Sequence, residues 1–165
     1  ERIGDINAWL KGGGKLELSG RQGGHYRARV NNQISFEKLL RVNPHVSFSV
    51  IFRCFPFWYR DNVSDITVTV SGTMITNPGN VSAEPLITVY GEGDISLMVG
   101  TTLVELEGVS GSIVLDCELK EAYAGSVLMN KHMAGEFPVL RPGANAVSWS
   151  GAVTKVVVRP NWREL

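Results

Sequence analysis

The sequence predicts a mainly β protein whose C-terminal two thirds form a β-sandwich or jelly roll. Short segments that alternate apolar and polar residues dominate from Asp65 onward, as they do in half-buried strands. Turn residues recur every ~8–12 positions along this stretch, a spacing typical of antiparallel sandwiches. The 165 residues are 44% hydrophobic and 19% charged, so the chain is too apolar and too weakly charged for a disordered segment.

The first 60 residues predict a smaller, β-rich unit with one helix. Ile3, Ile6 and Leu10 share a helical face, so we expect a short helix over residues 1–11 that ends at the glycines 12–14. A polar turn at 20–24 separates the first two of three strands, which we expect over residues 15–19, 26–34 and 46–55. Pro56 cannot donate to a sheet ladder, so we expect it to end the last strand and begin a boundary that runs to Ser64.

The second unit is predicted as a series of short strands joined by turns. Asn77-Pro78-Gly79-Asn80 has turn chemistry, and Gly100 predicts another reversal. We expect residues 91–94 (GEGD) to form a hairpin loop, because their glycines permit positive φ. The strands themselves are expected at 67–70, 86–90, 95–99, 103–106, 113–115, 147–149 and 153–158.

The charge balance argues against a general nucleic-acid binder, which needs clustered excess Lys and Arg. Lys plus Arg and Asp plus Glu each number 16, so the formal net charge is zero. The charge is unevenly distributed, with +5 over residues 1–62 and −5 over residues 63–165. Two domains with different solvent faces would explain this, and charge complementarity between subunits is the alternative.

No catalytic, cofactor-binding or metal-binding set is predicted. The glycines 12–14 before Lys15 do not fit a phosphate-binding loop, and His25, His45 and His132 lack partners at metal spacing, so we expect surface or loop positions for them. Cys54 and Cys117 lie in apolar strand-like runs and are expected to be buried free thiols, with a long-range disulfide as the alternative.

Two weak signals for sugar chemistry remain. The carboxylate pairs Glu92/Asp94 and Asp116/Glu118 have the spacing that a glycosidase needs, although such residues are usually solvated edges or turn formers. The tryptophans could stack on sugar rings, but we expect core or boundary packing for most of them, including Trp58, Trp149 and Trp162.

Several stretches, in order along nearly the whole chain, resemble the distal tail proteins (Dit) of long non-contractile-tailed phages and their prophages. They are INAWL at 6–10, LELS at 16–19, YRARV at 26–30, FRCFPF at 52–57, NPGN at 77–80, EPLITVYGEGD at 84–94, MAGEFPVLRPGAN at 133–145, WSG at 149–151 and PNWR at 160–163. The Pro-Gly motifs are expected to set tight turns and are not catalytic groups.

The resemblance implies a structural tail-tip hub that joins the tail tube to the adsorption apparatus or baseplate. It implies a C-terminal galectin-like β-sandwich (65–165), preceded by part of a β-rich (α+β) N-terminal domain (1–60) that forms a homohexameric ring. The first half of that ring domain would be missing from this chain. Expected partners are the chain itself, the tail tube protein, a tail-tip lysin-like protein and receptor-binding proteins, with no enzymatic activity, cofactor, nucleic acid or membrane insertion. The expected location is the virion tail tip, and the host cytoplasm during assembly.

An apolar cluster suggests where subunits meet. Phe36, Leu39 and Leu40 lie in the connection between two predicted strands and need cover, so we expect them at an intersubunit contact. The alternative function is a carbohydrate-binding module that reads host cell-wall glycans, and a hydrolase that uses the carboxylate pairs is a third possibility.

Overall fold

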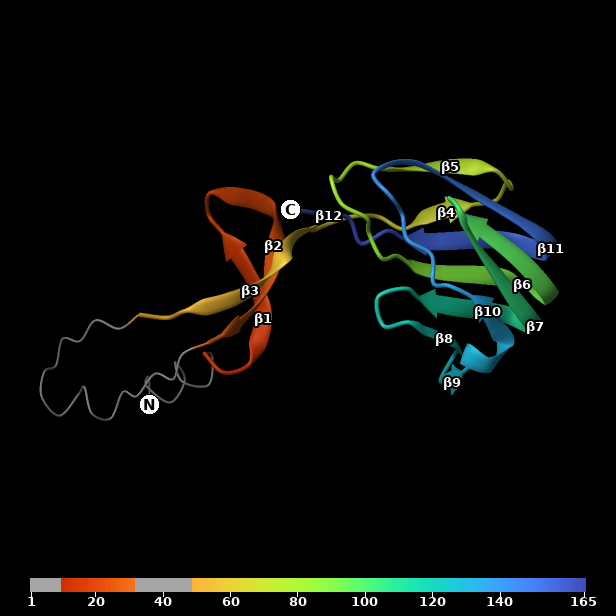
Figure 1. Cartoon of the computed structure of the whole chain (residues 1–165), viewed down its shortest axis with the longest axis horizontal. Helices are drawn as coiled ribbons and strands as arrows, with labels where there is room; N and C mark the ends of the chain where they lie inside the picture. Colours follow the sequence, from red (N-terminus) through yellow and green to blue (C-terminus); the bar gives the residue numbers. More distant parts are fainter. Residues whose placement is uncertain (1–9, 32–48) are drawn as a thin grey trace, which may run out of the picture. The chain divides into compact units, whose positions relative to one another are not determined.

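The structure is a computed structural model that describes residues 10–31 and 49–165. The protein is mainly β with a C-terminal β-sandwich, as predicted (Figure 1). The described residues contain one 3-10 turn, η1 (Asn130–His132), no α-helix and no helix able to cross a membrane. The predicted helix over 1–11 and the predicted contact residues Phe36, Leu39 and Leu40 lie outside the described residues, apart from the last two positions of the helix.

The chain divides into two compact units between Tyr59 and Arg60, and each is described by itself. The first unit contains β1 (Gly13–Leu18), β2 (Arg21–Val30) and β3 (Phe52–Arg60), with β2 between the other two. The strands β1 and β2 form a tight antiparallel hairpin. The prediction that Pro56 ends its strand is wrong, because β3 continues through it to Arg60. A strand can hold proline where it lacks a neighbour on one side, and within the first unit β2 is the one described neighbour of β3. The two-residue β12 (Arg163–Glu164) belongs to the second unit.

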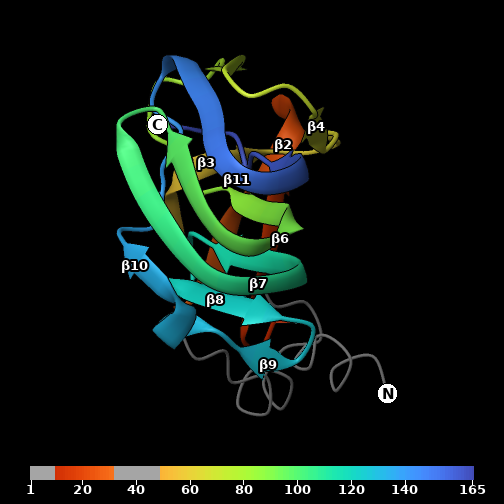
Figure 2. The same ribbon diagram turned by 90° about the vertical axis from the view of Figure 1, so that its right-hand side faces the viewer.

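Three long strands build the second unit: β6 (Leu86–Val99), β7 (Thr102–Asp116) and β11 (Gly143–Arg159). Each bends sharply near its middle, as Figure 2 shows, so that its two halves belong to different layers of the sandwich. One layer adds β5 (Thr73–Asn77) beside β11 and β10 (Met133–Gly135) beside β7. The other adds β4 (Ile66–Val68), β8 (Glu121–Ala124) and β9 (Val127–Leu128).

The predicted hairpin loop at residues 91–94 is wrong, because these residues form the bend inside the continuous strand β6. The register of β6 shifts between Gly93 and Ile95, and β11 shifts on either side of Ala152. A Cβ added at Gly151 would lie 2.5 Å from the carbonyl oxygen of Asp94, and one at Gly91 would overlap the carbonyl oxygen of Ala152. Glycine is therefore needed where the bent strands approach each other, not for a chain reversal.

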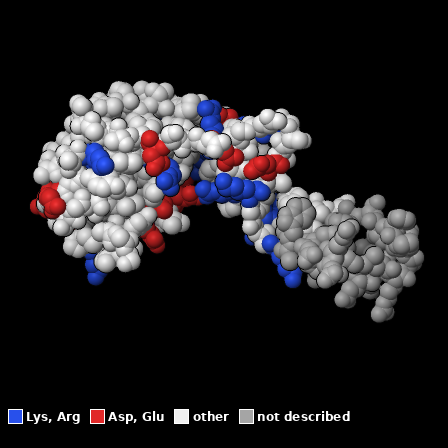
Figure 3. Space-filling model, turned by 180° about the vertical axis from the view of Figure 1, so that it is seen from behind, with Lys and Arg blue, Asp and Glu red and all other residues white. Residues whose placement is uncertain are grey.

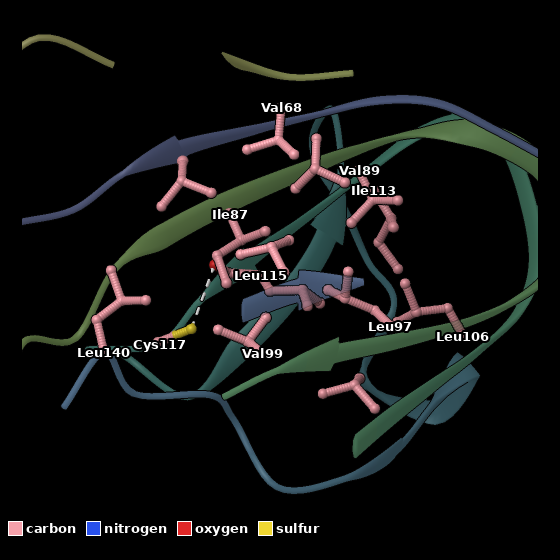
Figure 4. Close-up of a cluster of buried hydrophobic side chains, with 14 of the residues drawn as sticks. Val68, Ile87, Val89, Leu97, Val99, Leu106, Ile113, Leu115, Cys117 and Leu140 are labelled. Carbon is pink, nitrogen blue, oxygen red and sulfur yellow. Dashed lines mark hydrogen bonds between the residues drawn. The ribbon is translucent and has the colours of Figure 1, made fainter. Parts of the chain in front are cut away.

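The core lies between the two layers and is almost entirely aliphatic (Figure 4). Alternate residues of each long strand point into it, as the two-residue period of a strand requires. The largest fully buried side chains are Ile87, Ile95, Leu97, Leu106, Ile113, Leu115, Leu140, Val68, Val89, Val99, Val104 and Val147. Most of these side chains come from β6, β7 and β11. The core therefore forms only when these three strands bend and place their two halves in facing layers.

Two leucines on neighbouring strands test which strand face points into the core. Leu97 is 0% exposed, whereas Leu103, on the strand that pairs with β6, is 46% exposed. We expect Leu97→Ala to lower the free energy of unfolding by about 2–5 kcal/mol, because it leaves a cavity in a packed core. Leu103→Ala, the matched control, should change it by about 0.5 kcal/mol or less. Urea unfolding followed by tryptophan fluorescence measures both, and equal losses would contradict the assignment.

Candidate functional site

The carboxylates that suggested glycoside hydrolysis hold backbone groups instead. At the bend, the Glu92 carboxylate accepts a hydrogen bond from the N–H of Gly111 at 2.9 Å, and Asp94 accepts one from Gly108 at 2.9 Å. Asp116 accepts the N–H groups of Glu118 and Leu119, at 3.0 and 2.9 Å. Backbone amides at bulges and turns often lack a ladder partner, and a side-chain carboxylate can accept their hydrogen bonds.

The hollow beside the bend is a poor place for acid–base chemistry. It measures about 420 Å³ and is lined by Gly91, Glu92, Gly111, Gly151 and residues 152–154. Glu92 is the one ionisable side chain among these lining residues, and it is already bonded to Gly111. A glycosidase needs two carboxylates facing one cleft, so the geometry does not support the hydrolase hypothesis.

The two cysteines differ in exposure, and both are free thiols. Cys117 is fully buried in the sandwich core, as predicted. Cys54 is exposed, so the prediction of a buried thiol is wrong there. Its strand is apolar in composition, but within the described residues no second layer covers that part of β3. An apolar run indicates burial only where another element covers it.

The two described histidines, His25 and His132, belong to no metal site. No group of three His, Cys, Asp or Glu residues in the described part of the chain could hold a metal ion. His25 is buried, contrary to the surface position expected, and stacks on Tyr59 with ring centroids 5.8 Å apart. His132 is exposed in η1, as expected, and His45 lies outside the described residues.

The three tryptophans in the described part of the chain pack as predicted, which weakens the support for sugar stacking. Trp58 is 8% exposed and Trp162 is 7% exposed, while Trp149 packs against the sandwich core. Over the sandwich face in Figure 3, charged side chains are scattered and wide areas are uncharged. This face lacks the dense basic patch that nucleic-acid binding needs.

The first unit has a basic, aromatic sheet. Its described residues contain six Lys or Arg, namely Lys11, Lys15, Arg21, Arg27, Arg29 and Arg53, against the single acid Glu17. Arg21 lies over the ring of Trp58 at 4.3 Å, and Arg27 over that of Tyr59 at 4.1 Å. Gly24 makes this packing possible, because a Cβ there would overlap Trp58. Cation–π contacts of this kind add to the packing of the sheet.

The beginning of β3 is exposed on both faces of the strand. All five residues from Phe52 to Pro56 are exposed, including Phe55 at 62%, and the preceding Ile51 is 56% exposed. Successive strand residues point to opposite faces, so neither face is covered here by the described residues. Exposed apolar groups gathered in this way are typical of surfaces that another segment or another chain covers.

A hollow at this surface is the candidate site, and we call it the arginine hollow. It measures about 360 Å³ and is lined by Arg29, Arg53, Cys54, Phe55 and Pro56. The sequence showed only that Arg27 and Arg29 share a face of one strand. It gave no sign that Arg53, from a separate strand, would join Arg29.

The C-terminal residues form a strap around the start of the second unit. The N–H of Arg60 donates to the carbonyl oxygen of Trp162 at 3.0 Å, and the Arg60 guanidinium is paired with Glu164. Arg163 bonds Glu84 at 2.8 Å on the other side of the strap. The residue that follows the first unit is thus tied to the sandwich.

Comparison with known proteins supports the fold. No protein-family model matches the chain, and no curated protein matches it significantly. Among solved structures, a matching chain is the SPP1 Dit (gp 19.1) protein, described as a paradigm of the hub adsorption apparatus in phages that infect Gram-positive bacteria. The TM-score is 0.70 at 16% identity, over 95% of this chain and 69% of that one.

This chain has a Dit-like fold. At 16% identity the likeness shows the fold alone, and it agrees with the resemblance found in the motifs. That the first unit is part of a ring domain, and that its partners are other tail proteins, stay predictions.

The bend carboxylates offer a test of their structural role. We expect Asp94→Asn to lower the free energy of unfolding by about 1 kcal/mol, because a charged acceptor of a backbone N–H is replaced by a weaker neutral one. Glu107→Gln, an exposed change on the neighbouring strand, should have almost no effect. Denaturant unfolding measures both. A detected glycan-cleaving activity that Asp94→Asn abolishes would restore the hydrolase hypothesis.

The thiols give a prediction that depends on pH. Burial raises the pKa of the Cys117 thiol to about 12 from its ordinary value of 9.0. In 5,5′-dithiobis(2-nitrobenzoate) assays at pH 8, one thiol per native 165-residue chain should react at once, and two after denaturation. Two fast native thiols would show that Cys117 is accessible.

The raised pKa of Cys117 also predicts a loss of stability at high pH. Above about pH 9 the unfolded thiol ionises while the folded one stays protonated, so the free energy of unfolding should fall as pH rises.

Proposed function

We propose that the protein is a structural component of a phage tail tip, a distal tail protein that links the tail tube to the adsorption apparatus. The observation that carries this proposal is the Dit-like fold over 95% of the chain, together with the ordered motifs of the sequence. Fold alone does not give function, so the assembly has to be tested directly.

In this proposal the first unit belongs to a homohexameric ring, and the second unit faces tail-tip partners. The exposed start of β3, with Ile51, Phe52 and Phe55, supports an interface on the first unit, since such surfaces are usually covered by a partner. The predicted contact residues Phe36, Leu39 and Leu40 belong to the same unit. The tube protein, a lysin-like protein and receptor-binding proteins are the proposed partners, and the virion tail tip is the proposed location.

The test is the solution mass of the intact gene product by light scattering, with negative-stain images of the same peak. We expect a closed ring of about six copies, because cyclic assembly satisfies a repeated interface without open ends. A monomer at all concentrations would contradict the ring and favour the glycan-binding alternative, which tryptophan fluorescence with wall polysaccharides would then test.

Variants locate the interface within that assembly. Leu39→Asp with Leu40→Asp should reduce the mass to that of smaller species, because charges would be buried at the contact. Leu119→Asp with Leu128→Asp is the matched control, since both are leucines of the second unit that are already exposed, at 66% and 61%. An unchanged mass for the double variant would show that these leucines lie outside the interface.

A further inference from the structure

The arginine hollow is lined by two arginines from separate strands. Arg29 comes from the end of β2 and Arg53 from the start of β3, and both side chains are exposed. The exposed ring of Phe55 and Pro56 form apolar parts of the wall. Two cations beside an apolar wall are a common arrangement for recognising a carboxylate, because guanidinium binds it with two parallel hydrogen bonds.

These two arginines differ from others in the chain. Arg60 pairs with Glu164, and Arg159 pairs with Asp65. Within the described part of the chain, neither Arg29 nor Arg53 makes an ion pair, a side-chain hydrogen bond or a cation–π contact. Like charges that line one hollow repel each other, and an anion between them removes the repulsion.

The chain itself carries the complementary charge. Residues 1–59 contain nine Lys or Arg and four Asp or Glu, whereas residues 60–165 contain seven and twelve. The first unit is therefore +5 and the second −5. Exposed carboxylates such as Glu107, Glu121 and Glu136 lie on strands and loops of the second unit.

We propose that the arginine hollow is an intersubunit docking site that takes a carboxylate from the second unit of a neighbouring copy. The proposal rests on the proposed function, because it requires the ring. The hollow lies on the first unit and the carboxylates lie on the second, so a contact between two copies would join different surfaces, head to tail. A contact of this kind generates a closed ring when the rotation between copies permits it. Charge complementarity would also fix the register between copies and reject like-charged surfaces.

A native cysteine reports on the hollow without any substitution. Cys54 lines it and is exposed, whereas Cys117 is buried in the core. The rate of Cys54 alkylation by iodoacetamide is measured from its peptide by mass spectrometry, in assembled rings and in the same protein diluted to monomers. We expect labelling about tenfold slower in the ring, because a covered thiol is shielded from the reagent. Near 1 M salt, where screening acts within ~3 Å, the ring should loosen and the difference should shrink.

Substitutions test whether Arg29 and Arg53 hold the copies of the ring together. Arg29→Gln with Arg53→Gln should raise the dissociation constant of the ring about tenfold or more, while the circular dichroism of the chain stays unchanged. Arg141→Gln is the control for the loss of an exposed arginine elsewhere, because Arg141 is an exposed arginine of the second unit. Arg29→Lys with Arg53→Lys keeps the charge and should recover part of the affinity.

The outcomes separate the two proposals. If rings form and Cys54 reacts as fast in them as in monomers, or if the double glutamine variant assembles like Arg141→Gln, the docking site is wrong and the hub function stands. If no ring forms under any condition, the hub function fails first. Protection of Cys54 in monomers by a DNA oligonucleotide, without protection on assembly, would assign the hollow to phosphate and overturn the carboxylate proposal.

Discussion

The sandwich depends on the simultaneous bend of three adjacent strands. Because β6, β7 and β11 each contribute to both layers, a failure of the bend in one of them would remove pairing from two sheets at once. Glu92 and Asp94 accept hydrogen bonds from the backbone amides of Gly111 and Gly108 at the bend. Glycine at positions 91 and 151 lets the strands come within van der Waals distance there. Acids that resembled a catalytic pair in the sequence thus bind the backbone of the bend.

The sequence indicated the fold class because strand alternation and turn chemistry are local properties. The turn at Gly100 and the bend after Asn77 occur where they were predicted. Each of the three long strands was predicted as two short ones, because glycine permits both a chain reversal and a bend within a strand. The short strands β5, β8, β9, β10 and β12 were not predicted. Whether the chain reverses or only bends at Gly91 depends on the close approach of the Ala152 carbonyl, which is some sixty residues away in the sequence. No local pattern could therefore distinguish the two.

The candidate site was less predictable than the fold for a related reason. Cys54 lies in an apolar run that predicts burial, yet its exposure depends on whether another layer covers β3. The arginine hollow depends on which residue of β3 comes to lie beside Arg29 of β2, and such pairing is not fixed by either strand alone. Conversely, the turn motifs were correctly identified as structural. The buried side chain of Asn145 bonds the backbone of Arg141 in both directions, which closes the loop before β11.

The C-terminal strap ties the two ends of the second unit together. Arg60, the first residue of this unit, bonds Trp162 and Glu164 near its end. Trp162 is itself part of the sandwich core, so the strap holds Arg60 against the packed interior of the unit. The Arg60–Glu164 pair joins residues that are 104 positions apart, so it closes the chain of the sandwich upon itself as well as satisfying two charges.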